Sequence, residues 1–169
     1  EKESEFLSCQ FHSIDFSEQD LSGARFIECE FHQCNLSNAR LTGASFRESV
    51  FKSTKMIGCN FSTLNTCSDL SFIKVHLDFC VFQDLKMENT EFKECSLKEV
   101  DFSNTNLKRA KFNHSQLSGA IFNNCNLESA DFRDALNYYI DFSHNKIKNS
   151  KFNIPEAMNL FSQFEIQVD

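Results

Sequence analysis

The sequence predicts a solenoid of stacked square coils, in which each coil has four sides of five residues. Apolar residues recur at nearly every fifth position from Phe6 to Phe152. A small or thin residue, such as Cys29 or Ala110, lies two places before each of these apolar centres. A period of five fits neither an α-helix nor a β-strand, which repeat near 3.6 and 2 residues. A short fixed period is typical of stacked repeats.

The first regular stretch alone indicates how each side is built. Its apolar centres are Phe6, Phe11, Phe16, Leu21, Phe26, Phe31, Leu36, Leu41, Phe46, Phe51, Met56 and Phe61. The other three places of each pentad are mostly polar or charged, so each side points one large and one small residue inward. The interior should therefore be narrow and closely packed.

Between residues 62 and 71 the phase slips by one residue, because eleven residues separate Phe61 from Phe72. Thr66 falls where a centre is due, and Cys67 follows it. One extra residue bulging at a corner explains the slip. Bulges are commonly structural, and we favour that interpretation over a functional bend of the rod.

The second stretch, 72–132, adds a rule of alternation. Its odd centres are all Phe and its even centres are Leu or Met. On a four-sided coil this pattern places Phe on two opposite sides. Centres twenty residues apart should then stack in a column, as Phe72, Phe92, Phe112 and Phe132 would. Alternating bulky and slimmer residues fill a tight core without voids.

An irregular corner at 135–141 follows, where Asn137 occupies the place of a centre. Tyr138 and Tyr139, the two tyrosines of the chain, lie beside it. If exposed, the pair would be suited to anchor a partner. Alternatively, the two rings cover a wider corner. The sequence favours neither interpretation.

After Phe152 the period ends, and residues 153–169 form a separate C-terminal helix and tail in the prediction. Pro155 and Glu156 suit the first turn of an α-helix. We expect this α-helix to cap the solenoid of residues 1–152 and to join two copies in a homodimer, because it offers more apolar surface than one rod end covers. The expected interface comprises Met158, Leu160, Phe161, Phe164 and Ile166.

Composition agrees with one soluble domain. The chain has 169 residues, a single Pro and no apolar run long enough to span a bilayer. Seven of its eight cysteines occupy the small inward place, where Cys acts as a compact apolar side chain. We therefore expect reduced thiols and a cytoplasmic location, with no membrane association.

The pentads resemble those of the pentapeptide-repeat proteins, in which a small residue, Asp or Asn, Leu or Phe and two polar residues follow one another. Ala-Asp-Phe-Arg-Asp at 130–134 and Thr-Asn-Leu-Lys-Arg at 105–109 are good copies. The resemblance covers most of the chain. It implies an all-β fold, namely a right-handed quadrilateral parallel β-helix. About seven coils spaced by roughly 4.8 Å would make a rod about 35 Å long.

The C-terminal segment resembles a narrower group. Ala-Leu-Asn-Tyr-Tyr-Ile-Asp at 135–141 and Ile-Pro-Glu-Ala at 154–157 look like the ends of pentapeptide-repeat proteins that protect type II topoisomerases. This group includes the Qnr-type quinolone-resistance proteins. The resemblance implies a rod-shaped dimer that imitates duplex DNA and binds DNA gyrase or topoisomerase IV. Unlike many Qnr-type proteins, this chain has no inserted loops in its regular region.

The charge fits such a partner in part. The formal net charge of −7 argues against nucleic-acid binding. Duplex DNA of about 35 Å would carry roughly twenty net charges at one per ~1.7 Å, so the imitation would be partial. We expect the partner to contact an acidic surface made by Asp84, Glu88, Glu91, Glu94, Glu99 and Asp101.

Catalysis is not expected, and neither is a cofactor or a metal ion. The five histidines fall at or near outward places, and the narrow interior leaves no room for a substrate pocket. His12 and His32, twenty residues apart, would stack on one side, and a solvated pair is the simpler interpretation. The alternative to a topoisomerase-binding protein is a pentapeptide-repeat scaffold for a different protein partner.

Overall fold

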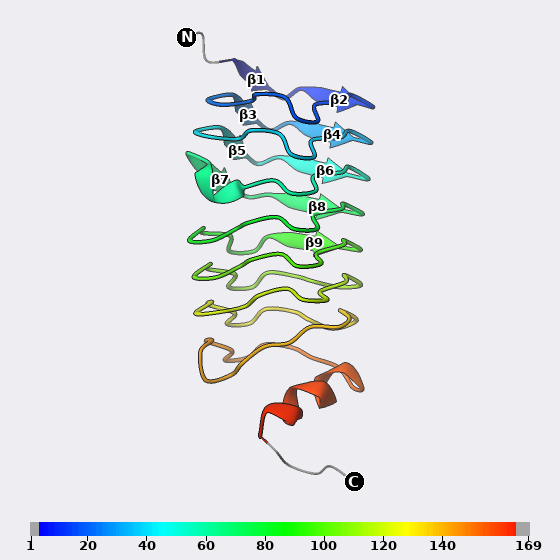
Figure 1. Ribbon diagram of the computed structural model, residues 1–169, viewed down its shortest axis with the longest axis vertical. Coiled ribbons are helices and arrows are strands. Elements are labelled where there is room, and N and C mark those ends of the chain that lie inside the picture. Colours follow the sequence, from blue (N-terminus) through cyan, green and yellow to red (C-terminus); the bar gives the residue numbers. More distant parts are fainter. Residues whose placement is uncertain (1–3, 165–169) are drawn as a thin grey trace.

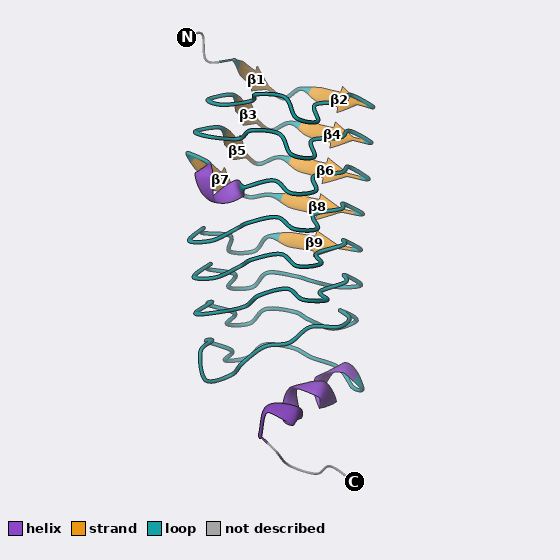
Figure 2. Ribbon diagram, viewed as in Figure 1, coloured by secondary structure: helices purple, strands orange, loops and turns teal. Residues whose placement is uncertain are grey.

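The computed structural model describes residues 4–164 and shows an all-β parallel solenoid. Its coils lie one above another along a straight rod, with the first strand at one end and the C-terminal helical segment at the other (Figure 1). Nine short strands are formed within these residues, and loops and turns make up most of the rest of each coil (Figure 2). They are β1 (Glu5–Leu7), β2 (Gln10–His12), β3 (Arg25–Ile27), β4 (Glu30–His32), β5 (Ser45–Arg47), β6 (Val50–Lys52), β7 (Thr66–Ser68), β8 (Ser71–Ile73) and β9 (Glu91–Lys93).

Two parallel sheets run along the rod, ordered β1-β3-β5-β7 and β2-β4-β6-β8-β9. The register in the first coils is twenty residues, so that Phe6 pairs with Phe26 and Phe11 with Phe31. Isolated parallel bridges continue the same register to Lys151, which pairs with Asp131. The four-sided coil of twenty residues that the period predicts is thus present.

The core follows the predicted pattern. The Phe72 ring stacks on Phe92 and Phe92 on Phe112, with ring centroids 5.2 Å apart in each pair. A second aromatic column, which includes Phe82 and Phe102, meets the first edge-on. The small inward residues are buried as well, among them Cys29, Ala44 and Ala110. Offset-stacked and edge-to-face rings each add about 0.5–1.5 kcal/mol to the burial of their apolar surface.

Most pentads turn their corner with one residue in the left-handed conformation. These residues stand two places after the apolar centre, and their φ angles lie near +60°, as at Asn38 (+55°) and Asn104 (+60°). The backbone N–H of the corner residue donates to the carbonyl of the coil that follows, for example from Asn38 to Ile57. Outward Asp and Asn side chains also accept from the turn, as Asp20 does from the Ser22 N–H.

The phase slip lies at a 3-10 turn, η1 (Phe61–Thr63). Across it the register is 21 residues, so that Phe46 pairs with Cys67 and Phe51 with Phe72, and it returns to twenty where Phe72 pairs with Phe92. Cys67, rather than Thr66, therefore takes the place of the missing centre. The residue added at this corner shifts the numbering of the later coils and leaves the sheets continuous.

The predicted C-terminal α-helix is wrong. No α-helix is formed within residues 4–164, and the segment folds instead as a 3-10 helix, η2 (Glu156–Phe164). The Met158 N–H donates to the Pro155 carbonyl three residues earlier. So short a segment is marginal as an isolated α-helix, and its amphipathic sequence pattern alone does not decide between the two kinds of helix.

The corner at 135–141 also differs from one of the two interpretations. Tyr138 is buried and packs its ring against those of Phe132 and Phe152, at centroid distances of 5.6 and 5.8 Å. It fills the core position that Asn137 vacates, one residue later. Tyr139 is exposed. The two tyrosines are therefore not a paired surface anchor.

Candidate functional site

The bridges divide the surface into four walls, which we number in chain order. The first wall contains β1, β3, β5 and β7, and the second contains β2, β4, β6, β8 and β9. The third wall carries the series of β-bridges that runs from Asp15 to Leu136. The fourth wall carries the bridge between Asp20 and Arg40 and the series that runs from Asn60 to Ile121. The third and fourth walls together comprise residues 15–24, 35–44, 55–65, 76–85, 96–105, 116–125 and 136–145.

Charge is divided unequally between these walls. The third and fourth walls carry eight acidic side chains and three basic ones, a net charge of −5. The acids are Asp15, Glu18, Asp20, Asp78, Asp84, Glu99, Asp101 and Asp141, and the bases are Arg40, Lys55 and Lys98. The first and second walls, over residues 5–155, carry eleven acids and thirteen bases, a net charge of +2. The rod thus has an acidic side and a nearly balanced, slightly basic side.

The six acids predicted as one surface do not lie on one side. They fall within residues 84–101, almost one full turn of the solenoid, and therefore circle the rod. Asp84, Glu99 and Asp101 lie on the acidic third and fourth walls. Glu88, Glu91 and Glu94 lie on the first and second walls, where bases neighbour them. The Lys74 Nζ, for example, is 3.5 Å from a Glu94 carboxylate oxygen.

Hydrogen bonds favour the ionised form of two carboxylates on the acidic walls, Asp101 and Asp141. Burial raises the pKa of Asp101, but hydrogen bonds from Ser103 and Gln83 outweigh it and hold that pKa below its usual value. Hydrogen bonds from Ser143 and His144 lower the pKa of Asp141 to about 2. Ser103 and Ser143 donate from the turn that follows each carboxylate, whereas Gln83 donates from the preceding coil. A carboxylate that accepts N–H and O–H donors is favoured in its ionised form.

Several bases of the opposite side have no carboxylate partner among the described residues. A shallow hollow between its coils is lined by Arg109, Lys111, Ser129, Asp131, Asn149 and Lys151. Asp131 in this hollow is held by Arg133, whose Nη2 lies 2.7 Å from a carboxylate oxygen. This side therefore does not offer the anionic surface that a DNA-binding protein would recognise.

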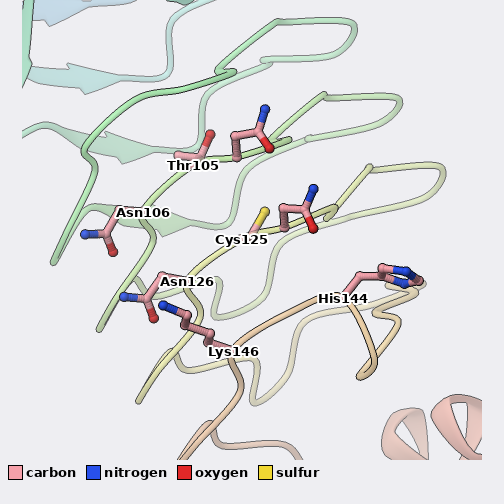
Figure 3. A pocket seen from close by; sticks show the side chains of 8 residues that line it. Thr105, Asn106, Cys125, Asn126, His144 and Lys146 are labelled. Carbon is pink, nitrogen blue, oxygen red and sulfur yellow. The ribbon is translucent and has the colours of Figure 1, made fainter.

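The other cavities lack a catalytic arrangement. One open hollow of about 240 Å³ lies over the column of Asn106, Asn126 and Lys146 (Figure 3). The Thr105 hydroxyl in it donates to the Phe82 carbonyl at 2.5 Å, and the Cys125 thiol donates to the Phe102 carbonyl at 3.0 Å. Burial raises the pKa of Cys125 to about 11. Both groups are therefore engaged by the backbone, and the thiol is protonated near neutral pH.

The histidine pair lies as the period predicts. His12 and His32 stack with ring centroids 4.7 Å apart, and His32 Nε2 is 2.8 Å from a Glu30 carboxylate oxygen. Within the part of the chain that the structure describes, no three His, Cys, Asp or Glu side chains are placed to hold a metal ion. The described residues also include no helix of the length and apolarity needed to cross a bilayer.

The predicted dimer residues are described only in part. Leu160 is buried, Met158 is half-buried and Phe161 is exposed. The side chain of Phe164 and the whole of Ile166 lie outside the described part. A dimer through a C-terminal α-helix loses its basis because that helix is not formed. Contact between two copies through these residues stays a prediction.

The fold and the matches to protein-family models indicate the same class of protein. The fold is a parallel β-solenoid with one inward pair of residues per pentad, and its surface presents charged walls and no catalytic centre among the described residues. A family model described as a pentapeptide repeat region matches residues 65–132. A second, described as eight copies of pentapeptide repeats, matches residues 9–47 and 24–62. The matches cover more than half of the chain, which therefore belongs to the pentapeptide-repeat family.

Solved structures of similar fold include two trypsin-treated variants of QnrB1, a plasmid-mediated fluoroquinolone-resistance protein. Each is 19% identical to this chain, and the match covers 98% of this chain and 90% of QnrB1, with TM-scores of 0.66 and 0.59. HetL, a pentapeptide-repeat protein involved in heterocyst differentiation in the cyanobacterium Nostoc, is 14% identical with a TM-score of 0.35, over 88% of this chain and 86% of HetL. No curated protein sequence matches the chain. These likenesses concern the fold.

Proposed function

We propose that this chain is a non-catalytic protein that binds a type II topoisomerase, DNA gyrase or topoisomerase IV, and shields it from quinolones or toxins. The acidic third and fourth walls would face the basic surface on which the enzyme holds DNA. The observation that carries the proposal is the net charge of −5 on two adjacent walls of a straight rod. The likeness in fold to a plasmid-mediated fluoroquinolone resistance protein supports a role in protection against quinolones.

The number of charges on the acidic walls sets how closely the rod can imitate duplex DNA. Duplex DNA would present roughly twenty charges over about 35 Å, whereas the acidic side of this rod carries eight acids. The contact should therefore be salt-sensitive and weaker than DNA binding. Because exposed charges more than about 10 Å apart are screened at 0.1 M salt, the acids should act mainly through close contacts with individual bases of the partner.

The test is direct binding of the chain to purified DNA gyrase and topoisomerase IV, together with a supercoiling assay with and without a quinolone. Two pairs of substitutions in one coil provide matched controls. Glu99→Gln with Asp101→Asn removes two charges from the acidic walls, and Glu91→Gln with Glu94→Gln removes two from the opposite side.

We expect the first pair to weaken binding by roughly tenfold, which is about 1.4 kcal/mol. The second pair should have little effect. No binding to either enzyme at micromolar protein would end the proposal. Equal losses from both pairs would show that net charge matters and the acidic walls do not.

A second candidate is a scaffold for a different protein partner. The basic hollow around Arg109, Lys111 and Lys151 favours it, because this hollow suits an acidic protein surface. Recovery of one stoichiometric partner other than a topoisomerase, with binding lost on Lys111→Glu, would favour the scaffold. A topoisomerase partner also requires a cytoplasmic location, which stays a prediction.

A further inference from the structure

Phe79 is out of place in an otherwise polar series of corners. The left-handed corner positions of the described residues are occupied by Gly or by polar and charged side chains, with Phe79 (φ +62°) as the one apolar exception. A bulky side chain at positive φ is disfavoured. Such strain costs of order 1–3 kcal/mol and tends to persist at functional sites.

The fold gains nothing visible from this ring. The Phe79 N–H donates to the Lys98 carbonyl at 2.9 Å, as the Glu99 N–H does to Ser118 one coil later, so the turn needs only a backbone. The side chain is 61% exposed. None of the ring contacts among the described residues involves it. Gly or Asn would make the same corner at lower cost.

The place of Phe79 is the corner between the third and fourth walls, at the centre of the acidic side. Half-buried Ile57 and Val81 belong to the same corner. In the preceding coil the matching position is Gly58, which has no side chain to cover the ring. In the following coil the Glu99 carboxylate lies over Gly119, where an added Cβ would come within 2.5 Å of it. The Glu99 side chain is therefore directed towards the following coil and away from Phe79.

Acidic side chains surround this apolar corner. Asp78 precedes Phe79 in the chain, and Glu99 and Asp101 come from the next coil. Asp78 is fixed in place, because its Oδ1 accepts from the Ser96 hydroxyl at 2.5 Å and from the Lys98 N–H at 2.9 Å. Lys98 is the single base of this corner in these two coils. An exposed aromatic ring within a charged rim has the form of an interface hot spot.

We propose that Phe79 is the anchor of the acidic side, inserted into an apolar pocket on the basic DNA-binding surface of the topoisomerase partner. This inference rests on the proposed function and adds a specific contact to it. Acidic side chains alone would bind any cationic surface, whether or not that surface binds duplex DNA. A strained, protruding ring adds the shape-specific contact that selects a surface with a matching pocket.

The test compares Phe79→Asn with Leu7→Asn. Asn is frequent at left-handed corners of this chain, and Leu7 is equally exposed, at 61%, on the first wall. Each variant of the full chain is titrated into purified DNA gyrase and topoisomerase IV by calorimetry, and its Tm is measured. We expect Phe79→Asn to weaken binding by roughly 30-fold, without lowering Tm, and Leu7→Asn to leave binding unchanged.

Each result decides a different point. If the native chain binds and Phe79→Asn binds as well as it does, the anchor is refuted and the proposed function stands. If both substitutions weaken binding equally, the effect is not specific to this corner and the anchor is also refuted. Failure of the native chain to bind either enzyme removes the proposed function, and the anchor with it. A fall in Tm for Phe79→Asn would assign the ring a structural role instead.

Discussion

Replacing Phe92 with Ala should destabilise the solenoid strongly, because this ring has four aromatic neighbours. It stacks between Phe72 and Phe112 at 5.2 Å and meets Phe82 and Phe102 edge-on at 6.0 and 5.7 Å. It is fully buried. Loss of its apolar surface removes about 1.5–3 kcal/mol. The cavity and the lost ring contacts bring the expected cost to about 3–5 kcal/mol, as for other buried Phe→Ala changes.

The assay is thermal and urea unfolding followed by circular dichroism. At about 2–4 °C per kcal/mol for a chain of this size, Tm should fall by roughly 6–20 °C. Phe161→Ala is the control, because Phe161 is 40% exposed and should cost little. Repeat arrays can lose two-state behaviour, so the two unfolding curves should also be compared in steepness. A loss below about 1 kcal/mol for Phe92→Ala would refute the stacked column.

Three further predictions concern the interior and the turns. Ala110→Phe should overpack the core and cost about 1–3 kcal/mol or more in urea unfolding, and normal stability would contradict the inward position of Ala110. Hydrogen bonds from Ser143 and His144 lower the pKa of Asp141 to about 2. The ionised carboxylate therefore stabilises the fold fully above about pH 4, and this stabilisation is lost as pH falls towards 2. Asp141→Asn should flatten the dependence of Tm on pH in that window. Burial raises the pKa of Cys95 to about 12, so this thiol should resist a disulfide reagent at pH 8 until the chain unfolds, and rapid labelling of the folded protein at Cys95 would count against a closed core.

The core could be predicted from the sequence because its constraint is local and repeated. Each pentad must supply one large and one small inward residue, so the same pattern is read many times, and single exceptions do not hide it. The stacking of Phe72 on Phe92 follows from a twenty-residue coil alone. The paired register of Cys67 could not be fixed in the same way, because a one-residue insertion can be absorbed at several positions of a corner.

The C-terminal end of the solenoid was harder to predict, since it does not repeat. Tyr138 takes the core position left by Asn137, but a Tyr next to a vacant centre can point either way until the backbone is known. The segment 156–164 has an amphipathic sequence, and this pattern does not distinguish a 3-10 helix from an α-helix. Local sequence is weak evidence where packing against the last coil decides the conformation.

The acidic side is not visible in the linear order of the charged residues. Neighbours in the sequence belong to different walls, and within 84–101 Glu91 and Asp101 lie on different sides of the rod. Counting the charged residues by their position within the twenty-residue coil separates the walls, provided that the one-residue slip after Phe61 is taken into account. The same count places Phe79 at a corner where the turn disfavours a bulky side chain. A residue that violates the local rule of a regular repeat is the strongest functional signal that such a sequence offers, since every neighbouring repeat shows what the fold alone would have chosen.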